Sequence, residues 1–347
     1  MTNIIDFANF RRGNVIETTS TIIKEEPIMT PIQTVGTIGR QSTFANLGTN
    51  IVNSTTVEEA LNEANANRML CKGEMYTKNP ITGEFILVPN TFSTIPIYNE
   101  YDVDTPLAGS VTSKYEIIQD YDSFSFLDCV PEAEIKKVGL NHDRTMSYLI
   151  AKIPEITILG DNYENYLCVR NYQNGRGNFE VTICPLRIVC QNQFNIAFKE
   201  SPNTITIRHS RQAPDRIESA KKVITAHNEY YKTLQIQANE WATTHVGAYS
   251  IQQVVEDLFP IKEDMKEFQK ERMEELRHLF NKALNSNDNQ NFKNSVWGMI
   301  NAYSDYITHR EPARQTSTAA ENRFMSVTFD PAIMNNFIQL VQSKIAA

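Results

Sequence analysis

A long apolar stripe begins shortly after Pro214. Apolar residues, with two histidines among them, recur there at alternate spacings of three and four, the period of one face of an α-helix. The stripe consists of Ile217, Ala220, Ile224, His227, Tyr231, Leu234, Ala238, Trp241 and His245. It predicts one continuous helix of about eight turns. Such a stripe must be buried against a sheet or another helix, so the rest of the chain has to supply that partner.

The chain before this helix has the pattern of β-strands. Short runs rich in β-branched and aromatic residues alternate with turn signals such as Asn79-Pro80 and Thr82-Gly83. The expected strands are 69–76, 84–88, 92–98, 110–118, 145–153, 166–171, 179–189 and 204–208. Turn-forming residues at 141–144 and 173–177 favour antiparallel hairpins. Short helices are expected after the capping hydroxyls at Ser54 to Thr56 and at 122–130.

The chain after the long helix stays helical. Segments 262–284, 292–307 and 332–345 have helical spacing, with a polar loop at 285–291 and a linker at 310–320. We therefore expect an α+β fold, with a mixed, largely antiparallel sheet flanked by helices and a helical C-terminal part. The expected divisions are an extended N-terminal arm at 1–55, an α+β core domain at 56–212, a helical region at 213–309, and a linker with the C-terminal helix at 310–347.

Composition indicates a soluble protein. Of the 347 residues 41% are hydrophobic, enough for a sizeable core. No run approaches the roughly 20 apolar residues that span a bilayer. The N-terminus lacks the basic start and apolar stretch of a secretion signal. We expect a cytoplasmic location and no membrane partner.

Cysteine and histidine spacing gives no sign of a metal or catalytic site. The five cysteines are Cys71, Cys129, Cys168, Cys184 and Cys190, an odd number with no C-x-x-C pair. We expect reduced thiols packed as small apolar side chains. A thiolate at Cys190 activated by His209 is the one nucleophilic arrangement to consider, and its position after an alternating apolar strand favours packing. The chain has no phosphate-binding P-loop motif. We predict no catalytic residues, no cofactor and no metal.

Charge is distributed unevenly along the chain. The net charge is −8, yet residues 165–222 carry nine basic and four acidic side chains, a local charge of +5. Aromatic residues are interleaved with these cations, as binding of single strands requires, because cations contact phosphates and aromatic faces stack on bases. The predicted nucleic-acid-binding residues are Arg170, Tyr172, Arg176, Arg187, Lys199, Arg208 and Arg211. The alternative is that the aromatic residues are core and the arginines solubilise strand edges.

Several segments resemble a known family. They are Pro185–Asn192 (Pro-Leu-Arg-Ile-Val-Cys-Gln-Asn), Leu107–Val111 leading to Lys114–Asp120, Ile207–Ser210, and Asn294–Gly298 leading to Tyr306 and His309. In order and spacing they are similar, from about residue 57 to 345, to the phage/plasmid-like proteins, a family built on domain of unknown function 932. The family's N-terminal Trp-His-Gly-Leu-Gly motif has no counterpart here. Asn171–Gly175 stands where the family has Ser-His-Asp-Gly.

The resemblance implies a protein of a phage or plasmid in a bacterial host cell, and implies no activity. With the basic region, it suggests a non-catalytic protein that binds, and anneals, single-stranded DNA in replication or recombination. The long stripe and the N-terminal arm both favour a homo-oligomer. Two alternatives stay open: a structural or protein-interaction factor of a phage, and a nucleic-acid-modifying enzyme with His209 and Cys190 in a pocket.

Overall fold

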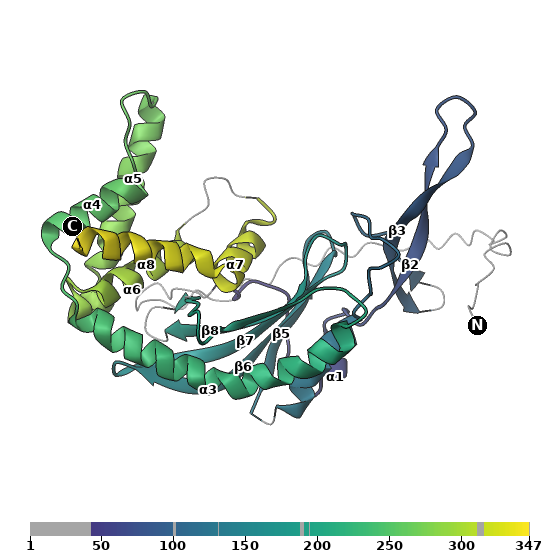
Figure 1. Ribbon diagram of the computed structural model, residues 1–347, viewed down its shortest axis with the longest axis horizontal. Helices are drawn as coiled ribbons and strands as arrows, with labels where there is room; N and C mark the ends of the chain where they lie inside the picture. The colour runs from purple at the N-terminus through teal and green to yellow at the C-terminus, as the bar shows by residue number, and fades with distance from the viewer. Residues whose placement is uncertain are drawn as a thin grey trace, which may run out of the picture. The chain divides into compact units, whose positions relative to one another are not determined.

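The computed structural model describes residues 43–346, apart from 100–101, 131, 188–190, 194 and 311–315. Within elements, the side chains of 99, 102–103 and 213–226 are also left undescribed. Most of the expected N-terminal arm and Cys190 therefore lie outside the described residues. In the described part of the chain, the elements follow the expected order: apart from two short helical segments, the strands come first and the helices follow (Figure 1).

The strands fall into two sheets. The described strands are β1 (Thr49–Asn50), β2 (Met69–Lys78), β3 (Phe85–Asn99), β4 (Asp102–Val103), β5 (Glu134–Leu140), β6 (Met146–Ile158), β7 (Asp161–Tyr172), β8 (Phe179–Arg187), β9 (Asn192–Gln193) and β10 (Thr204–Ile207). The larger sheet has the order β1-β5-β6-β7-β8-β10, with β9 also paired to β8, and the smaller is β2-β3-β4. Every ladder between these strands is antiparallel. The molecule is thus α+β, as expected.

In the described chain, two helical segments lie between β1 and β5, and the remaining helices follow β10. They are α1 (Val57–Glu63), α2 (Asp120–Phe124) with the 3-10 turn η2 (Ser125–Cys129), α3 (Ala213–Thr243), α4 (Ala248–Leu258), α5 (Glu267–Leu284), the 3-10 turn η3 (Asn287–Phe292), α6 (Val296–His309), α7 (Ala319–Phe329) and α8 (Pro331–Ile345). None of those in the described part of the chain is long and apolar enough to cross a bilayer.

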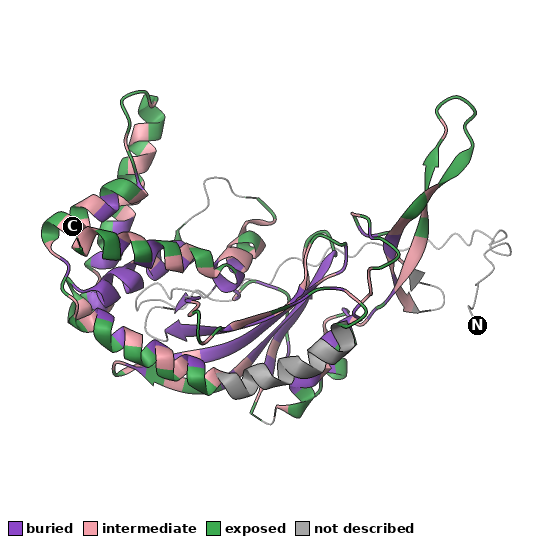
Figure 2. Ribbon diagram, in the orientation of Figure 1, coloured by how far each residue is buried: buried purple, intermediate pink, exposed green. Residues whose placement is uncertain are grey.

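Both faces of the larger sheet are buried, which explains why its strands are almost continuously apolar. Alternate residues such as Leu149, Leu167 and Val181 pack on α1 and the α2–η2 segment. The residues between them, such as Ile150 and Cys168, pack on Phe324 and Phe329 of α7 and on residues 44–47. Figure 2 shows β6, β7 and β8 buried along most of their length. Side chains of a strand alternate between faces, so one sheet takes part in two cores.

The predicted long helix is confirmed as α3. In its described half Tyr230, Leu234, Ala238 and Trp241 are buried. They belong to the core of the C-terminal helices, where the indoles of Trp241 and Trp297 stack with centroids 6.3 Å apart. The stripe ends with the helix at Thr243, and His245 is exposed.

Three local expectations were wrong. Residues 110–118 form no strand: Val111 makes a single bridge to Phe92, and the rest is extended loop held by side chains. Helix α4 was not expected, and α7 begins where the sequence predicted the end of a linker. Both are helices of 11 residues, and packing on other parts of the fold stabilises them. The apolar spacing of Ile251, Val254, Val255 and Leu258 is helical and could have predicted α4.

Candidate nucleic-acid interface

One end of the larger sheet is covered by the loop that precedes α2. The β5–β6 turn, the β7–β8 turn and the residues after β10 all lie at this end, because Met146 pairs with Tyr172 and Phe179 with Ile207. The loop crosses these turns: the backbone at Ser110 lies against Gly175, where a Cβ would come within 2.8 Å of the Ser110 carbonyl oxygen. The φ of +74° at Gly175 also requires glycine. Segments far apart in sequence therefore meet here.

The buried side chain of Asp120 holds this loop on the sheet. Its side chain is inaccessible to solvent and forms an ion pair with Arg68, whose Nε lies 3.0 Å from Oδ2. Its Oδ1 accepts hydrogen bonds from Ser147 Oγ at 2.6 Å, Gln173 Nε2 at 3.0 Å and Asn171 Nδ2 at 3.2 Å. A buried carboxylate with this many donors is fully satisfied and holds four segments in one geometry.

Tyr115 and His209 join the loop to the residues after β10. Their rings stack with centroids 4.7 Å apart and planes 9° apart. The Tyr115 hydroxyl donates to the carbonyl oxygen of Tyr172 at 3.1 Å, and His209 Nδ1 lies 3.2 Å from the Glu116 carbonyl oxygen. Burial lowers the pKa of His209 to about 4, so the imidazole is neutral near pH 7. This arrangement uses His209 for packing and gives it no access to a substrate.

Four exposed cations and the half-buried Lys72 lie around this loop. Arg176 is in the β7–β8 turn, Arg208 and Arg211 flank His209, and Lys114 precedes Tyr115. Lys72 of β2 donates to the Ser113 carbonyl oxygen at 3.2 Å. We call these five residues the cationic end. Among the described residues, no carboxylate forms an ion pair with any of them, whereas Arg144 nearby is paired with Asp104.

The structure separates the other predicted residues from this group. Arg170 forms an ion pair with Glu180 and lies over the Phe329 ring at 4.3 Å, with Tyr172 beside it at 5.4 Å. Arg187 is buried, where it pairs with Asp161 and donates to the Asp288 carbonyl oxygen at 2.9 Å. Lys199 is exposed in the loop before β10, at the opposite end of that strand. Three of the seven residues, Arg176, Arg208 and Arg211, thus come together.

Sequence reasoning missed Lys72 and Lys114. Both lie before the region of positive charge, in a part of the chain that is acidic as a whole. The resemblance had placed Lys114 in a motif, but only the fold of the loop over the sheet end shows which cations it approaches.

Two of the four described cysteines are packed thiols, whereas Cys71 is half-buried and Cys129 is exposed, so the expectation of packed thiols was wrong for Cys129. Cys168 and Cys184 are inaccessible to solvent within the core under α7. Burial raises the pKa of the Cys184 thiol to about 12 and that of Cys168 well above its usual value. Thiols with such a pKa stay protonated and unreactive near pH 7. These two residues confirm the structural interpretation.

The β2–β3 hairpin beside the cationic end is unusually apolar at its surface. Ile81 is 92% exposed, Phe85 74% and Tyr76 53%, and Ile86 and Leu87 are also exposed. Figure 2 shows the outer part of this hairpin as exposed. The backbone bridge between Phe92 and Val111 joins the hairpin to the loop of the cationic end. Exposed apolar side chains grouped in this way commonly mark a binding surface.

Comparison with known families matches residues 108–328 to a family described as a domain of unknown function (DUF932). The match is shorter than the stretch from 57 to 345 over which the resemblance extended, and it includes the loop of the cationic end, the larger sheet from β5 to β10 and most of the helices. Comparison with curated proteins found no match, and neither did comparison with solved structures. The matched region is well over half of the chain, and the protein therefore belongs to the DUF932 family.

Proposed function

We propose that this protein binds single-stranded nucleic acid at the cationic end and promotes annealing of complementary strands. The observation that carries the proposal is the grouping of Lys72, Lys114, Arg176, Arg208 and Arg211 on one loop-covered sheet end. Cations without carboxylate partners are available to phosphates, and phosphate contacts supply most of the affinity of non-specific binding.

The adjoining β2–β3 hairpin supports a preference for single-stranded over double-stranded nucleic acid. Tyr76 and Phe85 are exposed aromatic rings, and unpaired bases stack on such rings without sequence preference. A duplex keeps its bases stacked inside, so these exposed rings contribute little to its binding. The resemblance to proteins of phages and plasmids supports a role in replication or recombination of such an element, inside its bacterial host.

The proposal is tested by fluorescence anisotropy of the whole protein with a labelled 30-nucleotide DNA strand across a salt series. We expect binding that weakens log-linearly with salt, because counterions are released. The variant R176E/R208E should reduce the slope by about 1.4 or more, since each lost phosphate contact on a single strand contributes about 0.7. A fluorescence assay for pairing of two complementary strands should slow in the same variant.

The matched control is K262E/K293E, which makes the same change in net charge at two exposed lysines of the helical part. It should bind and anneal as the unsubstituted protein does. K199E changes a residue that was predicted from the sequence but lies away from the cationic end. We expect its strand binding to equal that of the control. Absence of binding at about 20 mM salt, where a Debye length of some 20 Å makes attraction strong, would contradict the proposal. So would equal losses in R176E/R208E and K262E/K293E.

A protein-interaction role is the second candidate, because the apolar hairpin surface favours it. Ile81 and Phe85 are largely exposed in the described chain, and Ile86 is about half exposed. A homo-oligomer would bury such a surface and would also line up cationic ends along a strand. The two roles are therefore compatible in one protein.

A further inference from the structure

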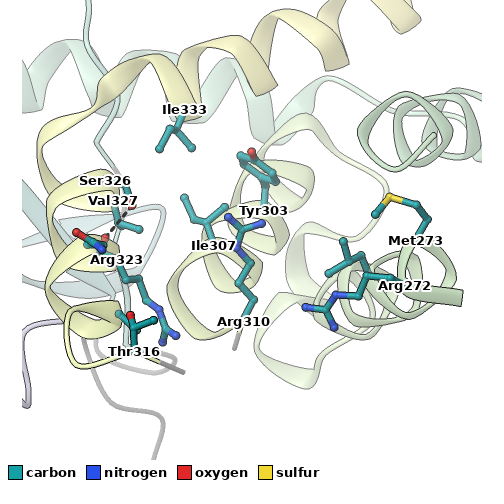
Figure 3. Close-up of a pocket in the computed structure, with 13 residues that line it drawn as sticks. Arg272, Met273, Tyr303, Ile307, Arg310, Thr316, Arg323, Ser326, Val327 and Ile333 are labelled. Carbon is teal, nitrogen blue, oxygen red and sulfur yellow. Dashed lines mark hydrogen bonds between the residues drawn. The ribbon is translucent and has the colours of Figure 1, made fainter. Parts of the chain in front are cut away.

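The outer edge of β2 identifies a partner more closely than the hollow among the C-terminal helices does. That hollow, of about 700 Å³, lies among α5, α6, α7 and α8, and Figure 3 shows Tyr303, Ile307 and Arg310 in its lining. Its described lining does not identify one kind of ligand. Strand β2 is the terminal strand of the smaller sheet, so one side of its backbone faces away from β3.

A side chain shows which backbone groups of β2 point outward. The Leu70 N–H donates to Gln119 Oε1 at 2.9 Å, and the Leu70 carbonyl oxygen accepts from Gln119 Nε2 at 2.9 Å. The Gln119 amide thus takes the place of a neighbouring strand. Backbone groups alternate in direction along a strand, so those of every second residue after Leu70 also point outward. These residues are Lys72, Glu74, Tyr76 and Lys78.

The pairing with β3 agrees with these directions. Phe92, which pairs with Glu74, turns its N–H and C=O away from β2 and bonds to Val111. At the turn, the Asn79 N–H donates inward across the hairpin at 2.8 Å, so Lys78, one residue earlier, points outward. The alternation therefore continues along the whole outer half of β2, although the register with β3 shifts between Glu74 and Tyr76.

The outward groups of residues 72–78 form an open edge. Within the described chain no hydrogen bond reaches their outward N–H and C=O groups, and this stretch contains no proline. The other edge of the hairpin is less open, because Pro89 interrupts β3 and Phe92 is already bonded. An edge strand with unpaired backbone groups is a template for a strand of another chain. We call residues 72–78 the open edge.

The charges of the open edge favour pairing with an identical edge. Two copies that pair antiparallel are related by a two-fold axis, and residues opposite one another have side chains on the same face. With Tyr76 on the axis, Glu74 of each copy lies opposite Lys78 of the other. Opposite charges in such cross-strand positions are stabilising, and like charges are destabilising.

Other registers of this pairing fit less well. An axis at Glu74 or at Lys78 sets that residue opposite its own copy, and an axis midway between Glu74 and Tyr76 sets Lys72 opposite Lys78. An axis between Lys72 and Glu74 pairs opposite charges but brings Leu70 into the ladder, where Gln119 already occupies the edge. The register with Tyr76 on the axis therefore combines opposite charges with free backbone groups.

We propose that the open edge pairs with the open edge of a second copy of this chain, antiparallel and with Tyr76 on the two-fold axis. Lys72 then lies opposite Pro80, where the turn of the other copy begins, so that turn stops short of Gln119. Figure 1 shows the outer part of the hairpin projecting from the larger sheet, so the two larger sheets lie at opposite ends of the pair. The pairing goes beyond the proposed strand binding and does not require it.

Sedimentation velocity of the whole protein without nucleic acid tests the pairing. We expect a particle with twice the 39.6 kDa mass of the chain. Glu74→Lys and Lys78→Glu each place like charges opposite one another twice, and each should weaken self-association about tenfold or more. Both side chains are exposed, so the fold should persist.

Exchange of the two charges tests the register. E74K/K78E restores opposite charges across the axis and should associate as the unsubstituted protein does. An equimolar mixture of the two single variants should form a mixed pair more tightly than either variant pairs with itself. Glu84→Lys is the matched control, because it makes the same charge change in the same hairpin outside the open edge, and it should leave association unchanged.

Three results would overturn the proposal. They are a single-chain mass for the unsubstituted protein, a pair that survives both single variants unweakened, and an E74K/K78E variant that stays as weakly associated as the single variants. Each measurement is made without nucleic acid. Loss of strand binding in R176E/R208E therefore bears on the cationic end alone, and failure of the pairing leaves the proposed strand binding as it stands.

Discussion

Single residues decide whether a charge is available to a ligand. Arg170 and Arg187 belong to the same basic stretch as Arg176 and Arg208, but each has a carboxylate partner inside the fold. A buried ion pair that loses one partner leaves an uncompensated charge, so these arginines are held by the structure. Counting charges along the sequence therefore overstates the cations that face solvent.

Replacement of Asp120 should be among the most destabilising substitutions in the sheet. Asp120→Ala leaves the buried Arg68 guanidinium unpaired and removes the acceptor of Ser147, Asn171 and Gln173. We expect a loss of about 3–5 kcal/mol in the free energy of unfolding, the usual cost of breaking a buried pair. Urea titration measures it.

The control is Asp122→Ala on the same short helix, where the side chain is exposed. A surface substitution of this kind should change stability by about 0.5 kcal/mol or less. If the two variants were equally stable, the hydrogen bonds of Asp120 would not be what holds the loop to the sheet.

His209 should make stability depend on pH. Its folded-state pKa of about 4 lies below the ordinary value near 6.5, so the unfolded chain binds the proton more readily. The contribution is fully present above pH 6.5 and is lost as the pH falls toward 4, by roughly 3 kcal/mol at one pKa unit per 1.4 kcal/mol. Tyr115, the Glu116 carbonyl oxygen and Asp120 are the groups that face the ring.

The measurement is the unfolding free energy of the unsubstituted protein and of His209→Gln at pH 7 and pH 4.5. Many carboxylates titrate in both proteins, so the difference between their pH dependences isolates His209. We expect the substituted protein to lose less stability on acidification. Identical pH dependences would show that the imidazole is not kept neutral by burial.

At the scale of elements, the strands and the long helix were predictable because their patterns are long and periodic. The apolar stripe from Ile217 predicted α3, and the alternation in 145–153 predicted β6; the structure has both elements. The loop at 110–118 was mistaken for a strand because Val111, Ile117 and Ile118 are strand-prone residues. The anchoring by Asp120, Tyr115 and Gln119 depends on partners 27 or more residues away. One example is the bond from Leu70 N to Gln119 Oε1 at a separation of 49, which no local pattern contains.

Gly298 illustrates an element-scale constraint. It lies inside α6, where alanine has the higher helix propensity by about 1 kcal/mol. A Cβ there would come within 2.1 Å of the Phe292 carbonyl oxygen, and Asn289 Nδ2 donates to the Gly298 carbonyl oxygen at 3.1 Å. The close approach of η3 to α6 therefore requires glycine.

We expect Gly298→Ala to destabilise the protein by about 2–3 kcal/mol, as overpacking does, despite the gain in propensity. Thermal melting and urea titration measure the loss. Gly247→Ala is the comparison, because nothing lies within 4 Å of a Cβ at that position. A stability gain in Gly298→Ala would show that η3 can move aside without cost.

At the scale of the whole molecule, the exposed hairpin predicts self-association. Light scattering with size-exclusion chromatography should give a mass that is a multiple of 39.6 kDa at micromolar concentration. Phe85→Ser with Ile86→Ser should reduce that mass toward one chain, because burial of apolar surface contributes about 25 cal/mol per Å². The free energy of unfolding of the isolated chain should hardly change, since both side chains are exposed.

Tyr249→Ser with Phe268→Ser removes two exposed rings from the helical part and serves as the control. It should keep the mass of the unsubstituted protein. A single-chain mass for the unsubstituted protein would exclude self-association through the hairpin and leave nucleic acid as the partner of that surface.

The candidate site was predictable only in part, because some of its residues are close in the sequence and others meet only in the folded chain. Arg176, Arg208 and Arg211 stand in one stretch of sequence, and their grouping follows from adjacent strands. Lys72 and Lys114 join them only because a loop crosses the sheet end.

The wide sequence separation of the Asp120 contacts has a consequence for the order of folding. Strands β5 to β8 are joined by short turns and pair locally, whereas the bonds of Asp120 close loops of 27 to 53 residues. Closing long loops costs entropy before any contact forms, so the loop should dock after the rate-limiting barrier. Asp120→Ala should then accelerate unfolding in stopped-flow experiments and leave the refolding rate nearly unchanged. A refolding rate that fell in proportion to the lost stability would instead place this docking within the folding nucleus.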